Sequence, residues 1–202
     1  MYKLERCVLS NGNQFVAGVD EVGRGPLAGP VVAAAVVLNP EDPIEGLADS
    51  KKLTAKRREF LMVELERHSL SIAVAAVGAR EIERVNILQA SLRAMATAVR
   101  RLTLPLGYIL VDGNRKVPVD IPQLAVVSGD SKCECIAAAS IVAKVVRDRL
   151  MERFDRRFPV YGFAQHKGYP TQAHQEAIRV NGPCFLHRRT FRGVTRTNRA
   201  GD

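Results

Sequence analysis

Two adjacent acids near the start of the chain, Asp20 and Glu21, are followed closely by the tripeptide Gly-Arg-Gly at residues 23–25. The preceding run, Phe15–Val19, is apolar and rich in β-branched residues, which predicts a buried strand. Carboxylates buried there are costly unless a cation or several donors compensate them. Because neighbouring residues of a strand point to opposite faces, a side-by-side pair requires the chain to bend, which the glycines allow. The pattern favours divalent metal ions beside a backbone that a substrate can touch.

Two further aspartates, Asp112 and Asp130, follow the β-rich runs Tyr108–Val111 and Gln123–Val127, and each adjoins a glycine. Alone, each could be a turn former, and Asp130 could cap the helix that follows it. Four acids at the ends of adjacent strands would repel one another and raise their pKa values. Hard oxygen ligands suit Mg²⁺ or Mn²⁺, and two such ions about 4 Å apart can promote phosphodiester cleavage. We therefore predict a two-metal site, Mn²⁺ or Mg²⁺, at Asp20, Glu21, Asp112 and Asp130.

The elements that must position these acids follow from the apolar periodicity. We expect strands over Phe15–Val19, Val31–Leu38, Ser71–Val77, Tyr108–Val111 and Gln123–Val127, and helices over Ala55–His68, Asn86–Arg101, Cys133–Phe154 and Gln172–Val180. This order predicts an α/β fold with a mixed central sheet flanked by helices and a helical C-terminal portion. We expect one domain over residues 1–202, with a core at about 15–157, the helical portion at about 158–192 and a polar tail at 193–202.

The net charge of +9 is unevenly distributed. Residues 1–50 carry −4 (3 basic and 7 acidic side chains), residues 51–140 carry +5 (14 and 9), and residues 141–202 carry +8 (13 and 5). A basic C-terminal third opposite an acidic N-terminal segment fits a phosphate-rich polymer held against a metal site. Charge alone leaves open a basic protein with no nucleic-acid ligand.

The four cysteines, Cys7, Cys133, Cys135 and Cys184, match neither a zinc spacing nor a disulfide framework, so we expect buried or inert thiols. No secretory signal opens the chain, and its longest apolar run, Val31–Leu38, is far shorter than the roughly 20 residues of a membrane helix. We expect a cytoplasmic protein without a membrane partner, and a monomer.

Longer motifs resemble bacterial ribonuclease HII over roughly residues 16–192. They are GVDEVGRGPLAGP at 18–30, DSKKL at 49–53, VDGN at 111–114, GDSK at 129–132, AAASIVAKVVRD at 137–148 and HKGYPT at 166–171. The resemblance implies an RNase H-like fold and a metal-dependent endoribonuclease that hydrolyses the RNA strand of RNA–DNA hybrids. It also implies incision 5′ to ribonucleotides embedded in duplex DNA, leaving 3′-hydroxyl and 5′-phosphate ends. Under this resemblance the four acids are the metal ligands.

The resemblance also implies substrate-binding residues. The backbone of Gly23, Arg24 and Gly25 corresponds to the tripeptide that reads the ribose 2′-hydroxyl, the group that separates RNA from DNA. Tyr169 matches the tyrosine that packs against the sugar at the junction. Four lysines in or beside the motifs are candidate phosphate contacts, although any one of them could be an ordinary solvated charge: Lys51, Lys52, Lys144 and Lys167.

Several nearby residues receive structural interpretations. Asp148 lies four residues after Lys144 on a predicted helix, so an ion pair explains it better than a metal-ligand role. We expect structural roles for three histidines, His166, His174 and His187. We also expect Arg188 and Arg189 to add to the basic surface.

The segment Cys133-Glu134-Cys135 departs from the family pattern, which carries small, apolar or proline residues there. Glu134 could adjust metal affinity or face solvent, and a Cys-x-Cys metal or redox site would lack a third soft ligand nearby.

Two other functions compete with this nuclease. An RNase H-like resolvase or recombinase would share the carboxylates but has no need of a 2′-hydroxyl reader. A non-catalytic nucleic-acid-binding module has no need of four acids, which oppose phosphate binding when no metal is present.

Overall fold

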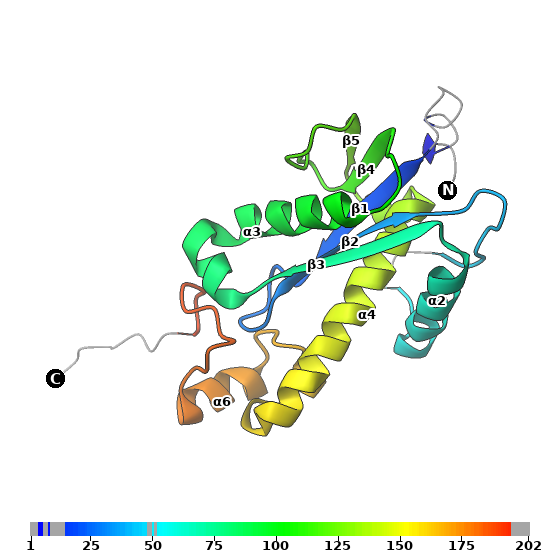
Figure 1. Cartoon of the computed structure of the whole chain (residues 1–202). Coiled ribbons are helices and arrows are strands. Elements are labelled where there is room, and N and C mark those ends of the chain that lie inside the picture. The colour runs from blue at the N-terminus through cyan, green and yellow to red at the C-terminus, as the bar shows by residue number, and fades with distance from the viewer. Residues whose placement is uncertain (1–3, 6–7, 9–14, 48–49, 51, 195–202) are drawn as a thin grey trace.

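The computed structural model describes residues 4–5, 8, 15–47, 50 and 52–194. Its centre is a five-stranded sheet in the order β3-β2-β1-β4-β5 (Figure 1). The strands are β1 (Val16–Val22), β2 (Val31–Val37), β3 (Ser71–Val77), β4 (Tyr108–Asp112) and β5 (Gln123–Val126). β1, β2 and β3 pair antiparallel, whereas β4 pairs parallel with both β1 and β5. The predicted mixed sheet of an α/β fold is therefore confirmed.

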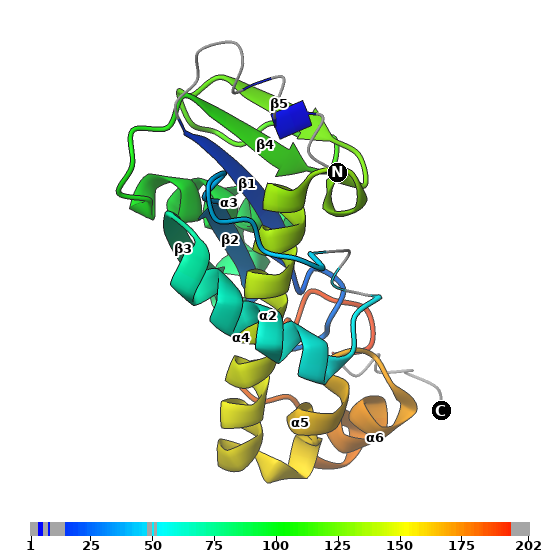
Figure 2. The same ribbon diagram turned by 90° about the vertical axis from the view of Figure 1, so that its right-hand side faces the viewer.

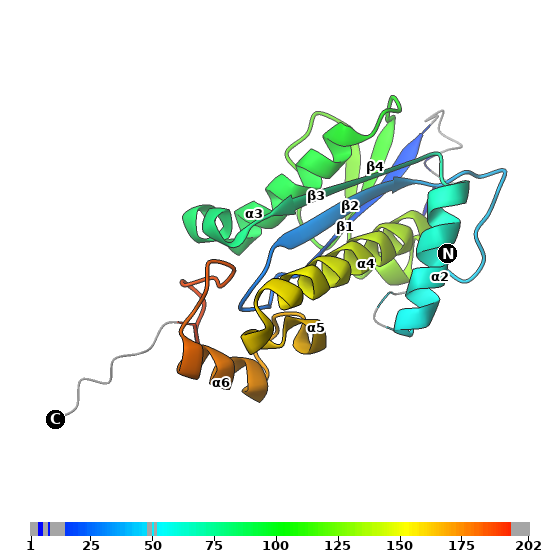
Figure 3. The ribbon, with the colours of Figure 1, turned by 60° about the horizontal axis from the view of Figure 1, so that its bottom comes forward.

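Helices cover both faces of the sheet. They are α2 (Ala55–His68), α3 (Ala79–Arg101), α4 (Glu134–Arg157), α5 (Phe163–His166) and α6 (Gln172–Asn181), with short 3₁₀ turns η1 (Gly129–Ser131) and η2 (Pro159–Tyr161). Figure 3 shows α3 on one face, and α4 with α2 on the other. All seven residues of β2 are buried, because alternate side chains pack under α3 and under α2 with α4. This explains why β2 is a continuous apolar run in the sequence.

Helix α4 lies directly against β1, the strand that carries the first two acids. Gly18 permits this approach, because a Cβ atom there would lie 2.1 Å from the carbonyl carbon of Cys135. At the N-terminus of α4, the Glu5 carboxylate accepts the Cys135 N–H at 2.8 Å. The Glu5 carboxylate thus satisfies one main-chain N–H at the start of this helix. The close packing fixes the strand end relative to the helix.

The largest departure from the predicted elements concerns α3. The sequence predicted a helix from Asn86, whereas α3 begins at Ala79 and is interrupted at Asn86, which has φ 67° and ψ 166°. The Asn86 side chain accepts the Gln89 N–H at 3.1 Å, so it caps the second half of the helix. The start signal was real, and the preceding helical segment was missed. The short elements η2 and α5 were also not predicted.

The chain beyond α4 folds back beside the far end of that helix (Figure 2). α5 and η2 contact α4, and α6 contacts η2. Thr171 caps α6 by accepting the His174 N–H at 3.2 Å. None of the described helices is long and apolar enough to cross a membrane. The division into core, C-terminal portion and tail stays a prediction.

Candidate active site

Three of the four predicted acids lie where two parallel strands end. Asp20 and Glu21 are near the end of β1, Asp112 is the last residue of β4, and the register pairs Val19 with Val111. The antiparallel ladder between β1 and β2 continues to Val22, so the chain does not bend between the two acids, and that expectation was wrong. The acids come together because a neighbouring strand delivers Asp112 beside them.

Asp20 and Glu21 face different sides of the strand. Asp20 is 6% exposed and interacts with the Ser140 hydroxyl of α4, and it accepts the Glu21 N–H at 2.7 Å. Glu21 instead helps to line a cavity of about 260 Å³ together with Asp112. The same cavity is lined by Arg24, Leu88, Ser91, Leu92, Met95, Gly113, Asn114 and Arg115. Glu21 and Asp112 therefore border a hollow between the strand ends and α3.

The electrostatics of these acids is unfavourable without a cation. Burial raises the pKa of Asp20 well above its usual range, and repulsion from Glu21 and then Asp112 raises it further. Burial also raises the pKa of Glu21, and repulsion from Asp112 adds to this, while Arg24 opposes it through an ion pair at 3.2 Å. Buried carboxylates that repel one another are the donor set that a hard divalent cation neutralises, so the residues fit such an ion.

Asp130 reaches the same region from η1. It is 5% exposed, and the preceding Gly129 N–H donates to Asp112 Oδ1 at 2.7 Å. Asp130 is therefore the residue next in the chain to Gly129, whose N–H orients the Asp112 carboxylate. Within the described part of the chain, no three or more His, Cys, Asp or Glu side chains are already gathered as a closed ion site. The acids instead flank the end of β1.

The loop after β1 is held by two buried arginines that the sequence did not identify as functional. Arg188 is fully buried, so the expectation that it adds to the basic surface was wrong, whereas Arg189 is exposed. The Arg188 guanidinium donates to main-chain carbonyls of the loop, at Gly23, Arg24 and Gly29. Arg147 of α4 is also fully buried and donates to the carbonyls of Ala28 and Pro30.

Segments from the C-terminal portion pack against the same loop. The Leu27 N–H donates to Gly168 O at 2.8 Å, and the Gly29 N–H donates to Leu186 O at 2.9 Å. This brings Tyr169, which is 40% exposed, beside the tripeptide, because a Cβ atom on Gly25 would lie 4.0 Å from its ring. The predicted ribose-reading residues are therefore neighbours in space although about 145 residues separate them in the chain.

The three histidines are neighbours: His174 and His187 are buried, and the half-buried His166 stacks on His174. Main-chain groups fix their tautomers: the Cys184 N–H donates to His187 Nδ1 at 3.0 Å, and His174 Nδ1 lies 2.9 Å from the Tyr169 carbonyl. His187 Nε2 must then donate to His174 Nε2, 3.1 Å away. Burial lowers the pKa of each of these two histidines to about 4. The structural role expected for them matches this neutral hydrogen-bonded chain.

The four candidate lysines differ in their surroundings. Lys144 pairs with Asp148 at 2.7 Å, which confirms the predicted helix-face ion pair. Lys167 pairs with Glu152 at 2.7 Å and also donates to a main-chain carbonyl. Lys52 is exposed just before α2, and Lys51 lies outside the described residues.

The Cys133-Glu134-Cys135 segment contains thiols rather than thiolates. Both cysteines are buried, and burial raises the pKa of Cys133 to about 11 and that of Cys135 well above its usual range. This agrees with the expected inert thiols and disfavours a thiolate metal site. Cys7 lies outside the described residues.

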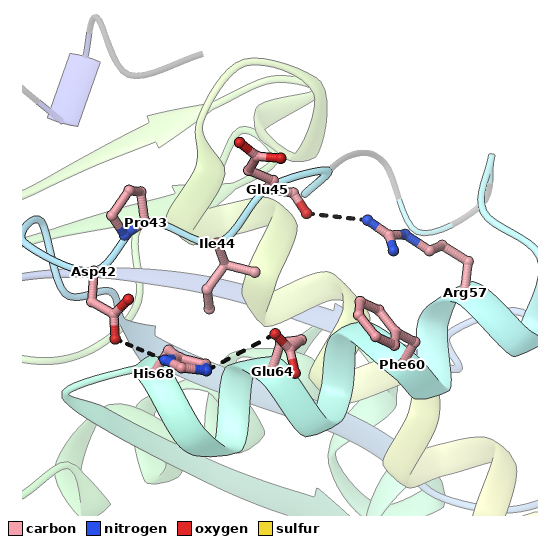
Figure 4. Close-up of a pocket in the computed structure, with 8 residues that line it drawn as sticks. All are labelled: Asp42, Pro43, Ile44, Glu45, Arg57, Phe60, Glu64 and His68. Atoms are coloured by element: carbon pink, nitrogen blue, oxygen red, sulfur yellow. Dashed lines mark hydrogen bonds and ion pairs between the residues drawn. The ribbon is translucent and has the colours of Figure 1, made fainter.

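A second cavity, of about 350 Å³, lies between the loop at residues 42–45 and α2. Figure 4 shows its lining, in which His68 pairs with Asp42 and with Glu64. It contains none of the predicted site residues. The hollow beside Asp112 is therefore the candidate active site.

One of the two arginines, Arg147, had a detectable signal in the sequence. Arg147 lies four residues after Ala143 and four before Met151, on a buried stripe of the predicted long helix. A charged residue within such a stripe must find polar partners inside the protein. Arg188 had no comparable signal, because it lies in an irregular segment.

The chain is similar to known proteins in both sequence and fold. The family model described as Ribonuclease HII matches residues 17–194. A ribonuclease HII of Syntrophotalea carbinolica is 54% identical over 190 residues, which cover 94% of this chain and 91% of that relative. The crystal structure of ribonuclease H2 from Pyrococcus horikoshii has a TM-score of 0.74 at 29% identity, covering 90% of this chain and 95% of that one. A structure of Bst-RNase HIII in complex with Mn²⁺ shares the fold, with a TM-score of 0.65 at 19% identity and coverage of 89% and 68%.

Proposed function

Because the chain belongs to the ribonuclease HII family and is thus an endoribonuclease acting on RNA–DNA hybrids, we propose that it also incises DNA duplexes at embedded ribonucleotides. The cut would lie on the 5′ side of the ribonucleotide and leave 3′-hydroxyl and 5′-phosphate ends. Family membership favours this nuclease over a DNA resolvase and over a non-catalytic binding module. We expect the enzyme to act as a monomer, which size-exclusion chromatography can check.

The proposed catalytic residues are the four acids at the strand ends, Asp20, Glu21, Asp112 and Asp130. The observation that carries this assignment is the burial of Asp20 beside two repelling carboxylates, a cost that a metal cofactor removes. The enzyme is metal-dependent as a member of its family, and we assign its cofactor as two divalent ions, Mg²⁺ or Mn²⁺. The Mn²⁺ complex of the related RNase HIII supports this choice. When bound, such ions activate water and neutralise the leaving oxygen.

The protein's own groups orient the ligands and the substrate. The Gly129 N–H fixes one oxygen of Asp112, and Ser140 with the Glu21 amide fixes Asp20. Arg24, which pairs with Glu21 in this structure, lines the same cavity and can turn to a substrate phosphate.

We assign reading of the ribose to the backbone of Gly23, Arg24 and Gly25, with Tyr169 against the sugar. The position of Tyr169 beside Gly25 supports this assignment. The lysines at 51, 52, 144 and 167 remain proposed phosphate contacts, of which Lys144 and Lys167 would have to leave their ion pairs.

The test is a cleavage assay on a DNA duplex with one internal ribonucleotide, on an RNA–DNA hybrid and on an all-DNA duplex. We expect cleavage of the first two only, with Mg²⁺ or Mn²⁺ and not with a chelator. Mapping of the product ends should place the cut 5′ to the ribonucleotide. Equal cleavage of the all-DNA duplex, or intact single-ribonucleotide substrate, would contradict the proposal.

A further inference from the structure

Two arginines lie buried beneath the loop at residues 23–30 without an acidic partner. Neither Arg147 nor Arg188 takes part in an ion pair among the described residues, and both are 0% exposed. Burial and repulsion from Arg147 lower the pKa of Arg188 to about 9, and burial also lowers the pKa of Arg147. Apolar side chains of similar size would be cheaper to bury. The arrangement therefore calls for a reason other than stability.

Arg188 makes four hydrogen bonds to three carbonyls of this loop. Its Nη2 donates to Gly23 O at 2.6 Å and its Nη1 donates to Arg24 O at 2.8 Å. Its Nε and Nη2 donate to Gly29 O at 3.1 and 2.9 Å. One rigid guanidinium thus joins both limbs of the loop, a geometry that a lysine ammonium cannot reproduce.

Arg147 supports the returning limb from below. Its Nε donates to Pro30 O at 3.0 Å and its Nη2 donates to Ala28 O at 3.2 Å. It also lies directly under Gly23, where a Cβ atom would be 2.2 Å from its Nε. The first glycine of the tripeptide is therefore required for contact with this guanidinium.

These contacts determine which groups the loop presents outward. In a trans peptide the carbonyl of one residue and the N–H of the next point in opposite directions, and the described chain has no cis peptide. Because Arg188 holds the carbonyls of Gly23 and Arg24 inward, the N–H groups of Arg24 and Gly25 point away from it. Gly25 is also the residue beside Tyr169. Two consecutive amide donors are thus fixed where the ribose is proposed to lie.

We propose that Arg188 is the positioning residue for ribose selection, with Arg147 in a supporting role. Arg188 orients the backbone amides of Arg24 and Gly25, which donate to the ribose 2′-oxygen. This inference rests on the proposed function of the tripeptide. It adds the side chain that turns the tripeptide's carbonyls inward and its N–H groups outward. The positive charge behind the carbonyls also polarises the peptide units, which strengthens their outward donors. Arg188 acts through the loop and does not itself touch the substrate.

The test uses Arg188→Lys in the full chain, with Arg67→Lys as the matched control, because Arg67 is an exposed arginine on α2. KM and kcat are measured with Mg²⁺ on a duplex containing one ribonucleotide. The inhibition constant of an all-DNA duplex of the same sequence is measured alongside, since it reports binding that uses no 2′-hydroxyl. Circular dichroism and thermal melting establish that each variant is folded.

We expect Arg188→Lys to raise KM for the single-ribonucleotide duplex by about tenfold, because the loop amides lose their fixed orientation and about one hydrogen bond to the 2′-oxygen is lost. The inhibition constant of the all-DNA duplex should stay within about twofold of wild type, since backbone phosphate contacts are unchanged. A folded variant with an unchanged ratio of the two constants would overturn the inference, as would parallel changes in both. If wild type itself bound both duplexes equally, the proposed ribose reading would fail instead.

If Arg188→Lys does not fold, Arg147→Lys applies the same criterion. Arg147 makes two hydrogen bonds to the loop and its Nη1 has no partner among the described residues, so less of the structure depends on it. We expect the same selective rise in KM, by about threefold, because its contacts hold only the returning limb. A folded Arg147→Lys with the wild-type ratio would then overturn the inference.

Discussion

Replacing Asp20 with asparagine should make the metal-free protein more stable and the enzyme inactive. The side chain is 6% exposed, and Glu21 and Asp112 both repel its charge. Asparagine has nearly the same shape, and its oxygen can still accept the Glu21 N–H that Asp20 accepts at 2.7 Å. The substitution therefore removes a charge while the packing stays intact.

The size of the effect follows from opposing contributions. The hydrogen bonds from Ser140 and the Glu21 amide lose their charge assistance, which costs about 1 kcal/mol each. Removing the charge of the buried carboxylate, which its neighbours repel, raises the free energy of unfolding by several kcal/mol. We expect the free energy of unfolding in a chelator at pH 8 to rise by about 1–3 kcal/mol. Cleavage should fall by at least about a thousandfold, because a ligand charge is lost.

Urea denaturation of both proteins, with a chelator and with Mg²⁺ or Mn²⁺, measures this prediction together with metal binding. Saturating metal at 100 times its Kd should stabilise wild type by about 2.7 kcal/mol and the variant by much less. Asp120→Asn, on the exposed loop before β5, is the matched control. A variant that is less stable than wild type in the chelator, or one that cleaves normally, would refute the reasoning.

Three further outcomes are expected. Gly18→Ala should destabilise the protein by about 3 kcal/mol or more, because its Cβ would lie 2.1 Å from the backbone of α4, whereas Gly78→Ala, with nothing within 4 Å, should not; thermal melting compares them. Tyr169→Ala should slow cleavage at single ribonucleotides about tenfold or more with little change in stability, since its ring is 40% exposed, and an unchanged rate would remove it from the site. Because burial lowers the pKa of His174 and His187 to about 4, the unfolded chain gains protons first as pH falls from 6.5 to 4, and the free energy of unfolding should fall by at most about 1.4 kcal/mol per pH unit for each. A His187→Gln variant with the same pH slope as wild type would contradict this, since all other acids and bases are common to both proteins.

The sequence predicted the regular elements because their signals are local. The bounds of α2 and β3 agree with the prediction, and Thr54 caps α2 by accepting the Arg57 N–H at 3.2 Å. The acids at strand ends were also predictable, since a strand that ends in an acid beside a glycine is visible in the chain. Their proximity required only that β4 lie next to β1. That pairing follows from the expected fold class.

The loop at 23–30 was beyond such reasoning, because its conformation depends on distant residues. Its carbonyls bind a helix residue, Arg147, and a residue near the C-terminus, Arg188. An arginine in an irregular, basic segment reads as a surface charge from sequence, and only the folded chain shows that it is buried. The same holds for the histidine pair, whose hydrogen bonds join α6 to a later segment.

The site thus combines unbalanced charge of both signs. The acids at the strand ends lack sufficient positive charge, and the arginines beneath the loop lack negative charge, yet the two groups flank one tripeptide. Pairing them directly would remove both costs, but an acid bound to Arg188 would displace the loop carbonyls and release the amide donors. Keeping them apart leaves the acids for a metal cofactor and the carbonyls for the arginine. Under the proposed function, the stability lost in this way is what a backbone that distinguishes ribose from deoxyribose requires.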